Sequence, residues 1–218
     1  MKETDLLVRA EIDLSRETRE SILKYRHQIE TYIETVPDFE RNLVPIRDDR
    51  YAPAIVQEMI RTSRLAQVGP MAAVAGAIAE SVSKDLLALS GEVIVENGGD
   101  IFLSIRKERV IGIYAGSSPL SLKIGIRIDR DESPIGVCTS SGTVGHSLSF
   151  GRADAVCILS ASAALADAAA TSVGNLVHSK EDIEKGLERG KEIPGVLGAL
   201  ILVGDKIGAW GKVELVQL

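Results

Sequence analysis

An alanine-rich segment near residue 165 constrains this chain more than any other part of its sequence. Residues 156–177 are almost entirely apolar or small, and Asp167 in ALADAAATS is the only charged residue among them. A helix that is apolar on every side has to be buried. A charge at the middle of a membrane span is costly, so the interior of a protein suits this segment better than lipid does.

The composition allows a large core made of small and aliphatic side chains. The chain has 218 residues, of which 45% are hydrophobic but only 4% aromatic, with 20 glycines. A chain of this size buries about 70% of its unfolded surface. The core is therefore expected to rest on Ala, Val, Ile and Leu, with glycines where backbones approach closely.

Charge and cysteine content exclude several classes of protein. The net charge of −6 argues against nucleic-acid binding, which needs a basic surface. Residues 1–11 carry charges throughout and do not resemble a signal peptide. Cys138 and Cys157 are too few for a disulfide framework or a zinc site made of thiolates. We expect a soluble cytoplasmic protein with reduced thiols and no membrane or nucleic-acid partner.

The first part of the chain predicts one strand and three helices. Residues 5–14 suggest a strand, and Ser15 is placed to cap a helix over 16–36 that stops at Pro37. The proline-rich, charged stretch 37–53 predicts an ordered loop and a possible subdomain boundary. Two more helices are expected, at 54–68 and 71–90, separated by Gly69 and Pro70.

The rest predicts short strands with two further helices. A meander of strands is expected at 92–96, 101–106 and 109–115, and another strand at 123–128. The run 136–151 lacks the aliphatic density of a core strand and predicts a glycine-rich turn. A strand at 154–160, a helix from Ser162 to about 177, a polar solvated helix at 181–190 and strands at 198–204 and 209–218 follow. The fold class is α+β, with antiparallel sheets packed against helices in one domain over 1–218.

The sequence VENGGDIF is the first candidate for a binding site. Gly98 and Gly99 let backbone N–H groups approach a ligand, and Asn97 and Asp100 flank them with polar side chains. An Asn-Gly pair is also a common hairpin signal. A hairpin turn explains the motif equally well.

The second candidate is the run 136–151, which concentrates hydroxyl groups around glycines. Its polar and glycine residues are Thr139, Ser140, Ser141, Gly142, Thr143, Gly145 and His146. Such a turn is a plausible cradle for a phosphate or carboxylate, or else a polar surface turn. His146 could be a general base, a ligand contact or a hydrogen-bonding partner of the turn. Cys138 and Ser141 are possible nucleophiles without a recognisable orienting group.

Two helical segments complete the candidates. Asp167 and Thr171 lie one turn apart and both offer oxygen ligands to a hard cation such as Mg²⁺. Alternatively, Thr171 bonds back to the carbonyl group of Asp167. In VGPMAAVAGAIAE, the helix start after Gly69, including Met71, has N–H donors that favour anions, although its small residues also suit close helix packing.

These blocks, in this order, resemble the ApbE-like family. The resemblance rests on ETDL at 3–6, VGPMAAVAGAIAE, VENGGDIF, TSSGTVGHSLSFGRAD and ALADAAATS, and extends over essentially the whole chain. It is closer to a branch whose activity is not established than to the flavin transferases, which use Mg²⁺ to move FMN from FAD onto Thr or Ser. The resemblance implies an ApbE-like fold.

The resemblance also implies a site with defined roles. In the transferases, the positions that match Gly98-Gly99-Asp100, Thr139 to Gly142, His146, Asp167 and Thr171 surround FAD and metal. From these positions, together with the candidates chosen from the residues themselves, we expect His146 and Asp167 to be catalytic and Asp167 and Thr171 to be metal ligands. The expected cofactor-binding residues are Gly69, Met71, Asn97, Gly98, Gly99, Asp100, Thr139, Ser140, Ser141, Gly142, Gly145 and His146. The implied ligand is FAD, FMN or another nucleotide-type small molecule, with Mg²⁺.

The chain departs from the transferases in two places. Their lysine in the helix-start block has no counterpart in Val74-Ala75-Gly76, and a charged strand and helix at 2–36 replace their amino-terminal segment. The alternatives are therefore a transferase-related flavin-binding protein, a non-flavin accessory protein in sulfur or cofactor assimilation, and a homo-oligomeric structural protein.

Overall fold

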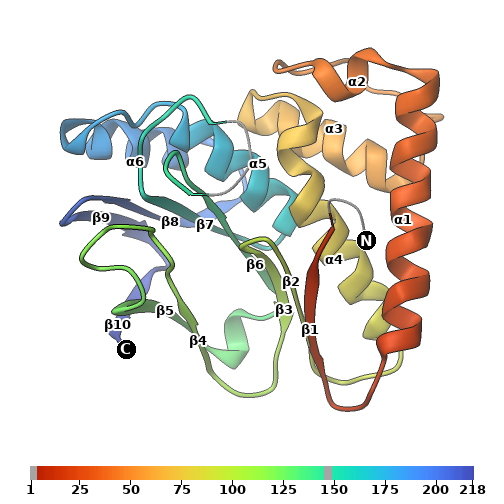
Figure 1. Ribbon diagram of the computed structural model, residues 1–218, viewed down its shortest axis with the longest axis horizontal. Helices are drawn as coiled ribbons and strands as arrows, with labels where there is room; N and C mark the ends of the chain where they lie inside the picture. The colour runs from red at the N-terminus through yellow and green to blue at the C-terminus, as the bar shows by residue number, and fades with distance from the viewer. Residues whose placement is uncertain (1–3, 145–148) are drawn as a thin grey trace.

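A seven-stranded antiparallel sheet is the middle layer of the structure, with helices on one face and a smaller sheet on the other (Figure 1). The computed structural model describes residues 4–144 and 149–218. The strands of the large sheet, in spatial order, are β1 (Leu6–Ala10), β2 (Val93–Asn97), β3 (Asp100–Ser104), β6 (Ile135–Ser140), β7 (Ala155–Ser160), β8 (Val196–Val203) and β9 (Lys206–Gly211). The three-stranded sheet contains β10 (Glu214–Gln217), β5 (Ile124–Ile128) and β4 (Arg109–Gly112).

The helices lie together against one face of the large sheet (Figure 1). They are α1 (Ser15–Thr35), α2 (Asp38–Arg41), α3 (Ala54–Ala66), α4 (Val74–Leu86), α5 (Ala163–Gly174) and α6 (Ile183–Glu192), with 3-10 turns at Pro70–Ala73, Arg130–Glu132 and Lys180–Asp182. The expected α+β class is confirmed. None of the described helices alone has the length and hydropathy to cross a membrane; the pair Ala54–Ala66 and Pro70–Leu86, bent by 103°, meets that test only when counted together.

Side chains point alternately to the two faces of the large sheet, so the interior is divided into two hydrophobic cores. In β7, Val156 and Ile158 face the helices, whereas Cys157 and Leu159 face the three-stranded sheet. Successive side chains of a strand point to opposite faces, so the large sheet carries an apolar layer on each side. A strand buried on both faces needs apolar residues on both, and β7 has them at every position except Ser160 at its end.

Helix α5 is buried in the middle of the helical layer, as its composition predicts. Ser162 is its N-cap and accepts a hydrogen bond from the N–H group of Leu165. A Cβ atom at Gly136 of β6 would lie 2.4 Å from the Cα atom of Ala163, and one at Gly76 of α4 would lie 2.3 Å from the Ala163 carbonyl oxygen. The start of α5 is thus held between a strand and a helix that both lack side chains at the contact.

Four predictions about the elements are wrong. The first five residues of the run 136–151 belong to β6, a central strand rather than a turn, and α5 packs so closely on it that only glycine fits at position 136. The strands at 92–115 do not form one meander, since β3 pairs with β6 and β4 pairs with β5 rather than with each other. The last strand is broken at Gly211 (φ +75°), so that β10 joins the other sheet. Ser15 is the first residue of α1 and not its N-cap, and its hydroxyl donates a hydrogen bond to the Asp13 carboxylate.

Candidate functional site

The turn between β2 and β3 is the centre of the candidate site. Asn97 pairs with Asp100 across a two-residue hairpin in which Gly98 and Gly99 have φ values of +64° and +102°. These conformations favour glycine. The motif is therefore a hairpin, as one of the two interpretations held, and it also lines a cavity.

Three segments that are distant in sequence meet beside this turn at the start of α4. The side-chain amide of Asn97 donates to the carbonyl oxygen of Ala75 at 3.1 Å. The N–H group of Gly76 donates to Asp167 Oδ2 at 2.9 Å. The N–H groups in the first turn of a helix have no partner within the helix. The anion at this helix start is thus the protein's own Asp167.

Asp100 is buried with one carboxylate oxygen unsatisfied. Its side chain lies opposite Cys138 in the ladder, and its Oδ1 atom has no hydrogen-bond partner among the described residues. Burial raises the pKa of Asp100 well above its usual value, and the negative charge of Asp167 raises it further. An unpaired buried carboxylate is costly, so this atom is expected to meet a proton or a cation.

Asp167 has a similar environment. Burial raises its pKa to about 7, although hydrogen bonds from the N–H groups of Gly76 and Ala75 act in the opposite direction. Two carboxylates that disfavour each other's charge in one buried site are typical of functional sites. Within the described chain, no three side chains of His, Cys, Asp or Glu are grouped so that they could hold a metal ion by themselves.

A cavity of about 1130 Å³ joins most of the predicted site residues. Those that line it are Met71, Asn97, Gly98, Gly99, Asp100, Thr139, Ser140, Ser141, Asp167 and Thr171. The cavity is also lined by α1 and β1, which contribute Arg26 and Arg9. The structure thus brings together the turn, the end of β6 and the middle of α5.

Two predicted glycines do not line the cavity. A Cβ atom at Gly69 would lie 1.8 Å from the carbonyl oxygen of Asn42, and one at Gly142 would lie 2.2 Å from that of Gly151. Each glycine therefore permits close contact between backbones. Gly145 and His146 are outside the described residues, so their roles stay predictions.

The environment of Cys138 opposes its use as a nucleophile. The side chain is fully buried, and its Sγ atom donates to the carbonyl oxygen of Ala163 at 3.3 Å. Burial and the neighbouring Asp100 raise the pKa of the thiol well above its usual value. The thiolate is the reactive form, so this thiol is expected to be inert.

The sequence reasoning missed Asp154, which holds Thr143 just after the end of β6. This buried carboxylate accepts hydrogen bonds from the Thr143 hydroxyl at 3.1 Å and from the N–H group of Gly204 at 2.6 Å. Ser118 donates to the carbonyl oxygen of Gly204 at 2.7 Å. The available signal was an acidic residue immediately before a strand that is apolar except for its last residue.

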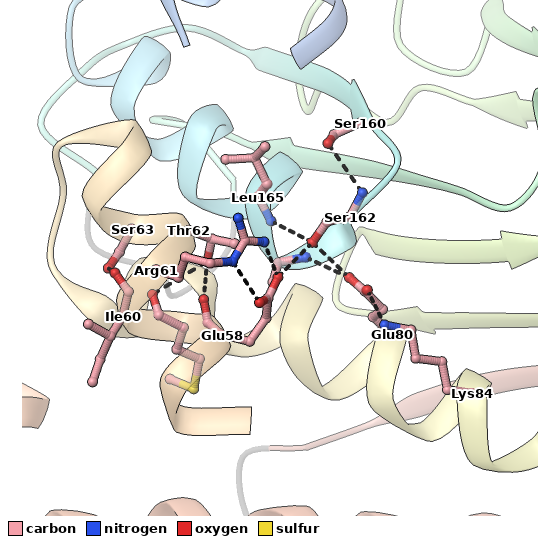
Figure 2. A network of polar contacts seen from close by, with 12 residues as sticks. Glu58, Ile60, Arg61, Thr62, Ser63, Glu80, Lys84, Ser160, Ser162 and Leu165 are labelled. Carbon is pink, nitrogen blue, oxygen red and sulfur yellow. Dashed lines mark hydrogen bonds and ion pairs between the residues drawn. The ribbon is translucent and has the colours of Figure 1, made fainter. Parts of the chain in front are cut away.

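A second missed feature is a polar network that holds the start of α5 (Figure 2). Glu80 of α4 is 7% exposed, and its Oε2 atom accepts hydrogen bonds from the Ser162 hydroxyl at 2.9 Å and from the N–H group of Ala164 at 3.3 Å. Its other oxygen pairs with Lys84 at 2.6 Å. Glu80 thereby places a negative charge at the helix start, where it is favourable, and fixes the helix that carries Asp167.

Comparison with solved structures shows where this fold has been seen before. The apo form of the flavinyl transferase ApbE from Pseudomonas stutzeri matches with a TM-score of 0.58 and 15% identity, over 95% of this chain and 94% of that one. A variant of the flavin transferase ApbE from Vibrio cholerae matches with a TM-score of 0.59 and 13% identity, over 97% and 95% of the two chains. At these identities the match shows the fold, which is ApbE-like.

Sequence comparison gives much nearer relatives. A UPF0280 protein of Methanococcus aeolicus is 44% identical over 93% of this chain and 82% of its own length. A UPF0280 protein of Methanocaldococcus jannaschii is 42% identical over 100% of this chain and 91% of its own length. The model of the family described as AbpE bacteria matches residues 1–214, and the chain belongs to that family.

Proposed function

We propose that this protein binds a flavin or a related nucleotide together with Mg²⁺ in the cavity beside the Asn97–Asp100 turn. The observation that carries the proposal is the buried, unsatisfied oxygen of Asp100, which shares the cavity with Asp167. A divalent cation would remove the repulsion between these two carboxylates. The flavin transferases that share the fold supply the ligand class.

The charges of the cavity support a requirement for a cation. Its lining contains five acidic residues, Glu30, Glu40, Glu96, Asp100 and Asp167, but three basic ones, Arg9, Arg26 and Arg109. When Asp100 and Asp167 are ionised, a phosphate group entering this acidic environment is repelled unless positive charge enters with it. Oxygen ligands such as carboxylates and hydroxyls suit Mg²⁺. The donor set therefore fits a magnesium-bound nucleotide.

The residues take distinct roles in this proposal. Asp167 and the Thr171 hydroxyl hold the cation, and Asp100 contributes further negative charge. A Cβ atom at Gly98 would meet nothing within 4 Å, and one at Gly99 only the Thr139 carbonyl oxygen at 3.9 Å. The backbone of the turn is accordingly open to a phosphate group. Bound Mg²⁺ would neutralise phosphate charge and polarise the bond to be broken.

The flavin transferases have a lysine in the block that corresponds to Val74-Ala75-Gly76, and the geometry at the start of α4 limits where such a side chain would fit here. A side chain at position 76 would collide with Ala163, whereas Val74 lines the cavity. Ala75 lines the cavity as well, so a longer side chain could enter it from position 74 or 75 but not from position 76. We propose nucleotide binding as the retained property and treat FMN transfer as a separate activity, to be measured apart from binding.

Calorimetric titration with FAD, FMN and ATP, each with and without Mg²⁺, tests the binding proposal. We expect binding of at least one of these that requires Mg²⁺ and is weakened at least about tenfold, or about 1.4 kcal/mol, in Asp167→Asn. Asp131→Asn is the matched control, because the side chain of Asp131 is 84% exposed on the surface. Absence of binding in every combination would contradict the proposal.

A sulfur-carrying role for Cys138 gains no support from the structure. Such a role needs an accessible thiol of low pKa, whereas Cys138 is buried and its pKa is raised. We therefore expect slow labelling of Cys138 by iodoacetamide in the folded protein.

A further inference from the structure

Arg26 is a largely buried positive charge on the wall of the cavity. It belongs to α1, its side chain is 15% exposed, and it lines the same cavity as Asp100 and Asp167. No lysine or arginine is among the site residues expected from the sequence. Burial of a charge is costly unless the charge is paired, so the contacts of Arg26 decide what it can do.

Two contacts hold the guanidinium group of Arg26. Its Nη1 atom donates to the hydroxyl of Thr4, a residue that is 7% exposed. Its Nη2 atom donates to Glu30 Oε1 at 2.6 Å, one helical turn further along α1. A guanidinium group has more N–H donors than these two contacts use. Within the described structure, donors of Arg26 therefore remain for a ligand.

The contact with Thr4 places the guanidinium group beside the Asn97–Asp100 turn. Leu6 of β1 pairs with Asn97, the last residue of β2, in an antiparallel ladder. The chain before Leu6 therefore lies in the direction in which β2 continues into Gly98. Thr4 comes two residues before Leu6, so it lies level with the turn, and it lines the cavity as well.

Arg26 approaches the turn from the helical side of the large sheet. Phe102 of β3 packs in the core beneath the helices, and side chains two residues apart in a strand share a face. Asp100 therefore points to the helical side as well, where α5 carries Asp167. One guanidinium group and two carboxylates thus lie on the same side of the sheet.

The other two basic residues that line the cavity lie elsewhere. Arg9 follows Val8, which packs against the helical core, so Arg9 points to the opposite face of the sheet. Arg109 belongs to the three-stranded sheet and pairs with Glu92. Among the described residues of the cavity wall, Arg26 is thus the positive charge on the helical side.

We infer that Arg26 binds a phosphate group of the ligand at the Asn97–Asp100 turn. The assignment deepens the proposed function and rests on it for the identity of the ligand. A guanidinium group that is held from two sides can donate parallel hydrogen bonds to two phosphate oxygens. Helix α1 would thereby supply fixed positive charge to the site, which Glu30 offsets in part.

Removal of the charge of Arg26 tests the inference. We expect Arg26→Met to bind FAD, FMN or ATP, each with Mg²⁺, at least about tenfold more weakly than the wild type, and Arg26→Lys, which keeps the charge but not the planar fork, to recover part of the loss. Arg19→Met is the matched control, because Arg19 is exposed on the same helix and does not line the cavity. Titration calorimetry measures binding, and urea unfolding shows whether each variant is folded.

Glu30→Gln separates a binding role of Arg26 from a structural one. Glu30 lines the cavity and accepts a hydrogen bond from the guanidinium group, so its neutralisation removes both a competitor and a negative charge. We expect this variant to bind the same nucleotides more tightly, by up to about fivefold. If Arg26 only held Thr4 and Glu30 in position, Arg26→Met and Glu30→Gln would both bind more weakly, and that result would overturn the inference.

Inorganic pyrophosphate with Mg²⁺ is a further probe that separates this inference from the proposed function. If a nucleotide binds a folded Arg26→Met as tightly as Arg19→Met, the inference is wrong and the proposed function stands. If no nucleotide binds but pyrophosphate does, and more weakly in Arg26→Met than in Arg19→Met, the proposed function alone fails. Absence of both kinds of binding in the wild type would contradict both.

Discussion

At the scale of single residues, the site depends on carboxylates that the fold has removed from water. Asp100 and Asp167 come from a hairpin turn and from the middle of a helix, and burial raises the pKa of both. Neither has a basic partner among its hydrogen bonds in the described structure; Asp167 is bonded by the N–H group of Gly76. These carboxylates therefore lower stability whenever both are charged.

The stability of the protein should accordingly depend on pH through Asp167. Its ordinary pKa is 3.8 and its pKa in the folded protein is about 7, so between these values the folded state keeps a proton that the unfolded state releases. Stability should then fall as the pH rises from about 4 to about 7, by a contribution on the order of 4 kcal/mol. Urea unfolding of the wild type and of Asp167→Asn, without Mg²⁺, measures it.

Asn at position 167 keeps an oxygen that accepts the Gly76 N–H group but carries no charge. We expect the variant to be more stable than the wild type near pH 8 and to lose that advantage near pH 4. Asp131→Asn should show no such change. A difference that stays constant over the whole pH range would show that Asp167 keeps an ordinary pKa in the folded protein.

At the scale of secondary-structure elements, the start of α5 determines where Asp167 lies. Ser162 caps the helix and bonds Glu80 of α4, which in turn pairs with Lys84 (Figure 2). Arg189 of α6 adds a further tie, donating to the Ser172 hydroxyl at 3.1 Å and to the Ala66 carbonyl oxygen at 2.8 Å. The alanine-rich helix is thus fixed by polar contacts at its ends and by close packing between them.

Removal of the α5 cap should be costly. We expect Ser162→Ala to lower the free energy of unfolding by about 1–2 kcal/mol, because the Leu165 N–H group loses its acceptor and the buried Glu80 loses a donor. Ser117→Ala, at an exposed serine, is the control and should change stability by less than about 0.5 kcal/mol. Equal denaturation midpoints for the two variants would refute the assigned capping role.

At the scale of the whole molecule, the helical layer and the large sheet are joined where α5 crosses β6. The contact at Gly136 is so close that a Cβ atom would lie 2.4 Å from the Cα atom and 2.6 Å from the nitrogen of Ala163. Neither neighbour is a flexible side chain. The sheet and α5 would have to separate to admit even one methyl group.

Gly136→Ala should therefore destabilise the whole fold. We expect a loss of about 3 kcal/mol, as for overpacked cores, together with weaker nucleotide binding because α5 moves away with Asp167. Gly190→Ala is the matched control, since its Cβ atom would make an ordinary contact at 3.4 Å with Ala199 and alanine favours the helix by up to about 1 kcal/mol. Thermal unfolding of both variants gives the comparison, and a neutral Gly136→Ala would contradict the close contact.

Local features of the sequence were enough to predict most helices and strands and the components of the site. The helix from Ser162, its burial and the hairpin at Asn97–Asp100 follow from composition, capping and turn chemistry, which act between neighbouring residues. The residues of the Asn97–Asp100 turn, Thr139 and Asp167 could likewise be identified as candidate site residues from local sequence, because each is a polar or flexible residue in an apolar segment.

The tertiary structure alone decided how these pieces meet. Strand β6 carries glycine at position 136 because α5 lies on it, and that requirement comes from a helix far along the chain. The pairing of β3 with β6, the separate sheet of β4, β5 and β10, and the approach of Asp100 to Asp167 likewise depend on contacts between distant segments. Sequence patterns record the needs of each segment, whereas the partner that satisfies them is set by the packing of the whole chain.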